Sequence, residues 1–215
     1  WQKAREVFYY LLSHSDSVPN ATLRDAIWPD LPEARSRDTL RAAIYQLRSV
    51  LPRDLIELEG RKAYRISRQV VRIDYDIEHF FSILDSNTDN PEILLEALDL
   101  YRGNYLPFTD NEWCVAMRAH VEQRYQQALH RTAKAYERRN AYADALPIYQ
   151  RVLTLDSLDE AAHAGIMRCQ IALGNRGAAI TQYQALRRVL DEELGLELDR
   201  SSEAENLYRE LLAAS

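Results

Sequence analysis

The sequence predicts a mainly α-helical protein with two modules, a small one that ends in a β-hairpin and a larger one that is helical throughout. Apolar residues recur at helical spacing along most of the 215 residues, and apolar and polar residues alternate around residues 55–66. Residues 1–72 hold 13 Lys and Arg against 9 Asp and Glu, whereas residues 73–215 hold 14 against 24. We therefore predict a basic domain over residues 1–72 and an acidic, all-α domain over residues 73–215.

The basic module begins with two predicted helices joined by a polar turn. Apolar residues form one stripe over Gln2 to Ser13, which predicts the first helix. Asn20 is placed to cap a short second helix that carries Leu23 and Ile27, and Pro29 ends it because proline cannot continue a helix.

A third helix is predicted from Ser36 to Leu51, with leucine and isoleucine on its inner face. At about 100° per residue, Arg41, Tyr45 and Arg48 share a face beside this stripe, with Arg37 one turn before Arg41. Such a helix fits the major groove, where arginine binds guanine or phosphate and tyrosine packs on a sugar or a thymine methyl. A solvated, arginine-rich surface is the alternative interpretation of the same pattern.

The alternating segment predicts a β-hairpin directly after this helix. Residues 55–59 and 63–66 flank Gly60, Arg61 and Lys62, so two adjacent cations stand at the tip. Two helices, a basic helix and a basic-tipped hairpin in this order indicate a winged helix-turn-helix, whose wing contacts phosphate or the minor groove.

The candidate DNA-contacting residues come from the third helix and the hairpin tip. They are Arg37, Arg41, Tyr45, Arg48, Arg61 and Lys62. We expect the helix arginines Arg41 and Arg48 to be exposed and to lie on one surface with the tip.

A 34-residue period runs through the acidic module. Asn140, Ala145, Leu146 and Tyr149 recur as Gly174, Ala179, Ile180 and Tyr183. This is the period of the tetratricopeptide helical hairpin, in which small residues lie where two helices touch and an aromatic residue fills the next layer. The array is expected to bind a partner or to be purely structural or dimerising. A long helix is predicted over residues 111–139, and Ser202 and Glu205 form a capping box before the last helix.

Motifs for catalysis or metal binding do not emerge from the sequence. The five histidines are scattered without ligand spacing, and no glycine-rich phosphate loop or nucleophile elbow is present. Cys114 and Cys169 lie in helical apolar patterns and are expected to be buried core residues. We expect no enzymatic activity, no cofactor and no bound metal.

Several segments resemble a known family. Leu23 to Asp30 (LRDAIWPD), Leu40 to Arg48 and Tyr64 to Ile66 resemble the OmpR-like winged helix of the SARP-type transcriptional activators. Ile73 to Phe80 and Tyr101 to Pro107 (YRGNYLP) are similar to the bacterial transcriptional activator domain, so the resemblance covers nearly the whole chain. The chain departs from the OmpR-like class in two respects. It starts essentially at the first helix, so the usual N-terminal sheet is expected to be missing or to lie in a removed N-terminal segment, and it has Ala63 at the wing glycine position.

This resemblance implies a sequence-specific transcriptional activator that binds double-stranded promoter DNA. Its helical domain would mediate homodimerisation or contact with RNA polymerase or a regulatory protein. The alternative is a protein-interaction scaffold whose winged helix is a docking surface and binds no DNA. The absence of a long apolar run predicts no membrane span and a cytoplasmic location.

The junction between the modules is the last feature with a structural consequence. Residues 67–74 include Val70, Val71 and Ile73 but neither glycine nor proline. Because flexible tethers have a different composition, we expect the two modules to pack together and to move as one body.

Overall fold

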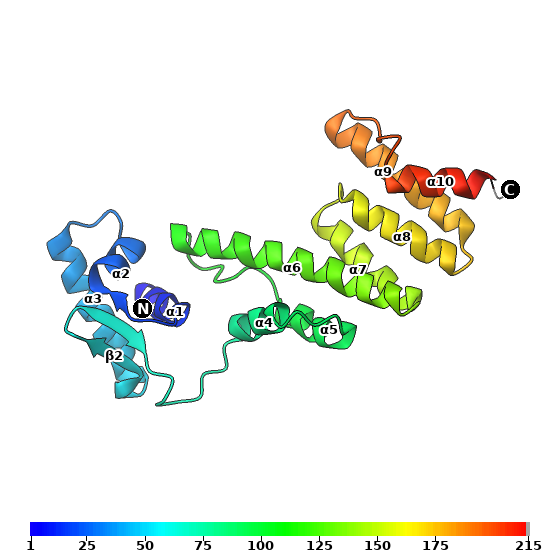
Figure 1. The fold of residues 1–215 in the computed structure, drawn as a ribbon. Helices are drawn as coiled ribbons and strands as arrows, with labels where there is room; N and C mark the ends of the chain where they lie inside the picture. The colour runs from blue at the N-terminus through cyan, green and yellow to red at the C-terminus, as the bar shows by residue number, and fades with distance from the viewer. Residues whose placement is uncertain (214–215) are drawn as a thin grey trace. The chain divides into compact units, whose positions relative to one another are not determined.

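The computed structural model describes residues 1–213 and is mainly helical, with one small sheet (Figure 1). The chain forms two compact units, the first comprising Trp1–Tyr75 with Asn104–Ala119 and the second comprising Asp76–Gly103 with the residues from His120 onward. This division differs from the boundary expected at residue 72, because residues 104–119 fold with the N-terminal unit.

Three helices and a three-stranded sheet make up most of the first unit. The elements are α1 (Gln2–Leu12), β1 (Val18–Pro19), α2 (Asn20–Ile27), α3 (Glu33–Val50), a short 3-10 turn (Arg53–Leu55), β2 (Ile56–Glu59) and β3 (Ala63–Ile66). The strand order is β1-β3-β2, and both pairings are antiparallel. Val7, Leu23 and Leu47 are buried where the helices meet. The expected order of three helices and a hairpin is therefore present.

Two details at the start of α2 and α3 differ from the sequence analysis. Asn20 does not cap α2: it is the first helical residue, and no side chain caps that end. The third helix begins at Glu33 rather than at Ser36, directly after Pro32 in an extended conformation. Strand β1 was not expected, since two residues are too short to show an alternating pattern.

The segment from residue 104 to residue 119 is held to α1 by a buried carboxylate. Glu6 is 1% exposed and accepts hydrogen bonds from Lys3 Nζ at 2.8 Å and from Asn111 Nδ2 at 2.5 Å. Nearby, the Trp113 ring packs edge-on against Tyr10 with ring centroids 5.1 Å apart. These contacts satisfy a charge that would be costly to bury alone, and they make residues 104–119 part of the N-terminal core.

Helices form all of the second unit within the described residues. They are α4 (Asp76–Asp85), α5 (Pro91–Leu100), the continuation of α6 (Glu112–Arg138), α7 (Tyr142–Leu155), α8 (Glu160–Ala172), α9 (Arg176–Leu194) and α10 (Glu203–Ala213). The predicted long helix corresponds closely to α6. Ser202 Oγ accepts a hydrogen bond from Glu205 N at 3.2 Å, as half of the expected capping box requires.

The 34-residue period matches repeated structural roles. Asn140 and Gly174 both adopt positive φ, at 56° and 78°, and each precedes the first helix of a repeat. Of the other six residues of the period, Ala145, Ala179 and Tyr149 are fully buried, Tyr183 is 5% exposed, and Leu146 and Ile180 are both half-buried. The helical domain therefore fits the tetratricopeptide-like architecture expected from the sequence.

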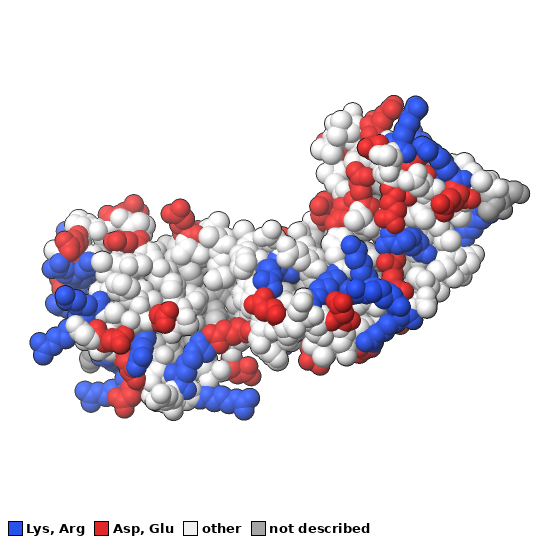
Figure 2. All heavy atoms as spheres, in the orientation of Figure 1, with Lys and Arg blue, Asp and Glu red and all other residues white. Residues whose placement is uncertain are grey.

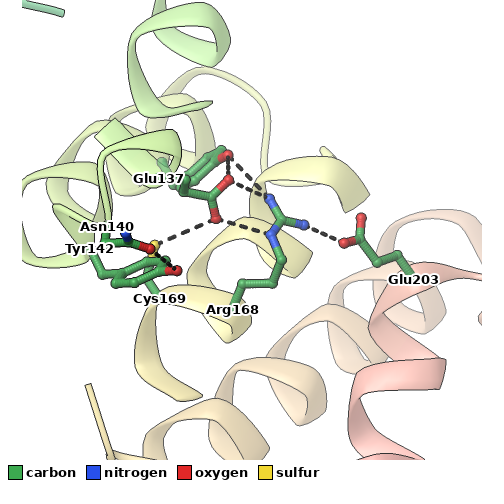
Figure 3. A network of polar contacts seen from close by, with 7 residues as sticks. Glu137, Asn140, Tyr142, Arg168, Cys169 and Glu203 are labelled. Carbon is green, nitrogen blue, oxygen red and sulfur yellow. Dashed lines mark hydrogen bonds and ion pairs between the residues drawn. The ribbon is translucent and has the colours of Figure 1, made fainter. Parts of the chain in front are cut away.

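An arginine on α8 links three other helices of this unit (Figure 3). Arg168 donates to both carboxylate oxygens of Glu137 on α6 at 3.0 Å, to the Tyr149 hydroxyl at 3.2 Å, and to Glu203 on α10. Cys169 lies against the same carboxylate. Both cysteines are fully buried, as expected, and burial beside Glu137 raises the pKa of the Cys169 thiol to about 11, so the thiol stays protonated at neutral pH.

Gly165 on α8 is required by its contact with Tyr149. A Cβ atom added at this position would lie 2.5 Å from Cζ of the Tyr149 ring. We expect Gly165→Ala to lower the free energy of unfolding by about 1–3 kcal/mol, because a fully buried ring must shift. Gly177→Ala is the matched control, since nothing lies within 4 Å of its added Cβ. Equal stability of the two variants in thermal denaturation would contradict the packing argument.

Asn111 tests the buried attachment of residues 104–119. Asn111→Ala leaves the Glu6 carboxylate with Lys3 alone, so we expect a loss of about 1–3 kcal/mol in chemical denaturation. Gln2→Ala removes an exposed hydrogen bond between the same two segments, from Gln2 Nε2 to Phe108 O at 2.7 Å, and is expected to cost much less. If both variants lose the same stability, burial of Glu6 is not what holds the segment.

Candidate nucleic-acid interface

One side of α3 is buried in the first unit and the other presents cations and a tyrosine. Leu40, Ile44 and Leu47 are each 3% exposed. On the other side, the Arg41 side chain is 78% exposed and Tyr45 is 77% exposed, the largest fraction among the exposed large hydrophobic residues described. Figure 2 shows Lys and Arg side chains, with Asp and Glu side chains among them, on the part of the surface where α2, α3 and the hairpin lie.

Arg48 differs from the expectation that it is exposed like Arg41. It is half-buried, and its guanidinium donates to the main-chain oxygen of Ile56 at 2.6 Å. Because Ile56 is the first residue of β2, Arg48 connects α3 to the hairpin. Its location beside the exposed face is as expected, but part of its hydrogen-bonding capacity is used within the protein.

The hairpin tip is a tight turn with two left-handed residues. Gly60 and Arg61 have φ of 55° and 60°, and Lys62 N donates to Glu59 O at 3.0 Å. The tip is also attached to α2, because Asn20 N donates to Lys62 O at 2.7 Å and β1 pairs with β3 beside it. Within residues 1–213 neither Arg61 nor Lys62 forms an ion pair, so the charge at the tip is uncompensated by close carboxylates.

Two adjoining pockets run between α3 and the hairpin. The arginine pocket has a volume of about 320 Å³ and is lined by Asn20, Arg24, Arg37, Leu40, Arg41, Leu58, Arg61 and Tyr64. The tyrosine pocket has a volume of about 570 Å³ and is lined by Arg41, Ile44, Tyr45, Arg48, Ser49, Arg53 and Tyr64. Five of the six sequence-predicted residues line one or both, and Lys62 lies outside them on the exposed turn. Arg41 and Tyr64 border both pockets and so join the helix face to the hairpin.

This site also contains three residues that the sequence pattern does not predict, Arg24, Arg53 and Tyr64. Tyr64 was assigned only to a strand, and Arg53 lies in the short turn after α3. Arg24 follows Leu23 directly and is buried with it in α2. An arginine at the edge of an apolar stripe is the one sequence feature that could have marked it as a site residue.

Carboxylates near the arginines set how much positive charge is free. Glu33 Oε1 lies 2.5 Å from Arg37 and 3.6 Å from Arg24, and Asp38 lies 3.7 Å from Arg41. The Arg37–Glu33 and Arg41–Asp38 pairs are exposed on both sides, so each contributes little to stability and can be exchanged for another anion, whereas the Arg24 side chain of the third pair is buried. On β2, hydrogen bonds from Ser67 and Arg65 hold the pKa of the Glu57 carboxyl below its usual range.

A second candidate surface lies in the second unit beside the Arg168 network. A pocket of about 380 Å³ is lined by Glu137, Arg138, Tyr142, Arg168, Ile171, Ala172 and Leu207. In the part of the chain that the structure describes, no group of three His, Cys, Asp or Glu side chains is placed to hold a metal ion. None of the described helices is sufficiently long and apolar to span a bilayer.

Comparison with protein families assigns the larger part of the chain to a known family. The model of the bacterial transcriptional activator domain matches residues 86–212. The chain belongs to this family. The family match includes residues 104–119, which fold with the N-terminal unit, and most of the second unit. A search of curated proteins finds no match.

A solved structure has a similar fold along the whole length of this family member. It is EmbR from Mycobacterium tuberculosis in complex with a low-affinity phosphopeptide, with a TM-score of 0.76 and 16% sequence identity. The similarity covers 100% of this chain and 60% of the EmbR chain, so the present chain corresponds to a little over half of that protein's length. At this identity the comparison supports the fold alone.

The left-handed conformation of Arg61 gives a test of the turn. Arg61→Gly is expected to leave the unfolding free energy unchanged or to raise it by up to about 1 kcal/mol, whereas Arg61→Val should lower it by about 1–2 kcal/mol, because a β-branched residue is strained at positive φ. Both variants remove the same charge, so thermal denaturation isolates the backbone effect. Similar melting temperatures for the two variants would argue against a left-handed residue at this position.

Proposed function

We propose that this chain is part of a SARP-type transcriptional activator and that its first unit is a winged helix-turn-helix that binds double-stranded promoter DNA. In this proposal α3 enters the major groove and the hairpin tip contacts the backbone or the adjacent minor groove. Membership in the bacterial transcriptional activator domain family supports the regulatory role. Arg37, Arg41, Tyr45, Arg61 and Lys62 are the proposed contacts.

The observation that carries the proposal is the continuity between the exposed face of α3 and the hairpin. Arg41 and Tyr45 project from the helix. Arg61 of the tip lines the arginine pocket together with Arg41 and the hairpin residue Tyr64, and Lys62 follows it on the exposed turn. A tyrosine exposed to 77% beside arginines suits a surface that stacks on sugar or base edges while the cations neutralise phosphates. Arg48 is assigned a supporting role through its bond to β2.

Binding of promoter DNA at two salt concentrations tests this proposal. Arg41→Gln is expected to weaken binding by about 1–3 kcal/mol if the side chain reads a base, whereas Lys62→Ala should weaken binding to all sequences and reduce the salt slope by about one unit. Arg188→Gln, which removes an exposed arginine from α9, is the control of equal charge change and should bind as the wild type does. Wild-type protein that binds no duplex, or three variants of equal affinity, would refute the proposal.

The helical domain is proposed to contact a second subunit, RNA polymerase or a regulatory protein. The 380 Å³ pocket beside Arg168 supports this role, because apolar residues from α8 and α10 adjoin charged side chains there. The alternative is a protein-interaction scaffold that binds a partner at the same pocket and binds no DNA. This alternative gives the exposed arginines of α3 no function. The proposal includes no catalytic step and no cofactor.

A further inference from the structure

Arg24 on α2 is a buried cation with one unpartnered donor. It is 9% exposed, and its Nε has no hydrogen-bond partner within the described residues. Its ion pair is with Glu33, at 3.6 Å, which is beyond hydrogen-bonding distance. Because burying a guanidinium without hydrogen bonds is costly, native proteins normally give such groups a partner. Arg24 therefore lacks a hydrogen-bonded counter-ion among the described residues, and its side chain lines a pocket.

The surroundings of Arg24 suit an anion with several acceptor oxygens. Arg24, Arg37, Arg41 and Arg61 line the same pocket of about 320 Å³, and no carboxylate is among its lining residues. The Asn20 amide also lines this pocket, and its Oδ1 is buried without a partner. Arginine and amide donors that converge in this way match a phosphate group.

The location of the pocket indicates which phosphate it would bind. It lies between the exposed face of α3 and the turn that carries Arg61, where the backbone of a duplex docked on α3 would pass. We infer that Arg24 binds one phosphate of the DNA backbone, and that Glu33 holds the charge of Arg24 and Arg37 in the free protein until this phosphate replaces it. The inference rests on the proposed function and adds to it a buried contact and a competing carboxylate.

Salt-dependent binding of a mixed-sequence DNA duplex tests the inference with the full chain. Each phosphate contact contributes about 0.9 to the slope of log affinity against log salt. Arg24→Gln is expected to weaken binding about tenfold, the loss given by one charge-assisted hydrogen bond, and to lower the slope by about one unit whatever the DNA sequence. Glu33→Gln is expected to act in the opposite direction, with tighter binding and a steeper slope, since the competing carboxylate is gone.

Two controls distinguish the loss of this phosphate contact from unfolding of the variant and from a general loss of positive charge. Arg65→Gln removes an exposed arginine next to Tyr64 on β3; because neighbouring strand residues face opposite sides, it lies away from the pocket and should leave the slope unchanged. Circular dichroism verifies that Arg24→Gln is folded. If it is not, Glu33→Gln in the background of Arg37→Gln decides the question, because Arg24 is then the arginine left beside Glu33, whose side chain is 66% exposed and whose loss leaves the core intact.

The outcomes distinguish the inference from the proposed function. Wild-type binding with unchanged slopes in both Arg24→Gln and Glu33→Gln would overturn the phosphate contact and leave DNA binding standing. Absence of binding by the wild type would overturn both. If inorganic phosphate raises the melting temperature of the wild type but not of Arg24→Gln, and no duplex binds, the pocket is a site for a soluble anion and its assignment to DNA is wrong.

Discussion

The burial of the Glu6 carboxylate is the constraint on which the first unit depends. Its partners are Lys3 on the same helix and Asn111 from a segment about a hundred residues later in the chain. Helix α1, which carries Glu6, packs on α3 and β3 by its other residues. The elements that present the proposed DNA surface therefore share a core with residues 104–119. Since the family match includes these residues, the boundary of the family domain and the boundary of the folded unit do not coincide.

Arginine serves three purposes in this molecule, and the neighbouring groups decide which. Arg168 is bound by two carboxylates and a tyrosine hydroxyl and joins four helices. Arg48 donates to a main-chain oxygen and fixes the hairpin to α3. Arg41 has only an exposed pair with Asp38 at 3.7 Å and keeps its donors available. Residue type alone thus identifies a basic surface, whereas hydrogen-bond partners separate the structural arginines from those that are free to bind a ligand.

Local patterns in the sequence were sufficient to predict most of the helices and strands, but they do not predict the contacts between distant segments. The helical period placed α1, α6 and the repeats, and alternation placed the hairpin within one residue of its strands. Strand β1 was missed because its two residues carry no period, and its pairing with β3 depends on residues 44 and 46 positions away. The asparagine expected to cap α2 instead lines a pocket. Arg24 was missed because its role depends on α3 and on the hairpin turn, which no pattern within α2 reveals.

The net charge of the basic module is a poor measure of the charge it can offer to a polyanion. Glu33, Asp38 and Glu57 each lie beside an arginine of the same unit. Arg61 and Lys62 have no ion-pair partner among the described residues, and Arg24 has a distant one. Because exposed pairs are weak and are screened by salt, an incoming phosphate can displace the carboxylates at α3 at little cost. The carboxylates of Glu33, Asp38 and Glu57 then weaken the non-specific attraction of the first unit for anions. A partner must contact α3 and the hairpin turn together in order to bind all of the cations on this surface.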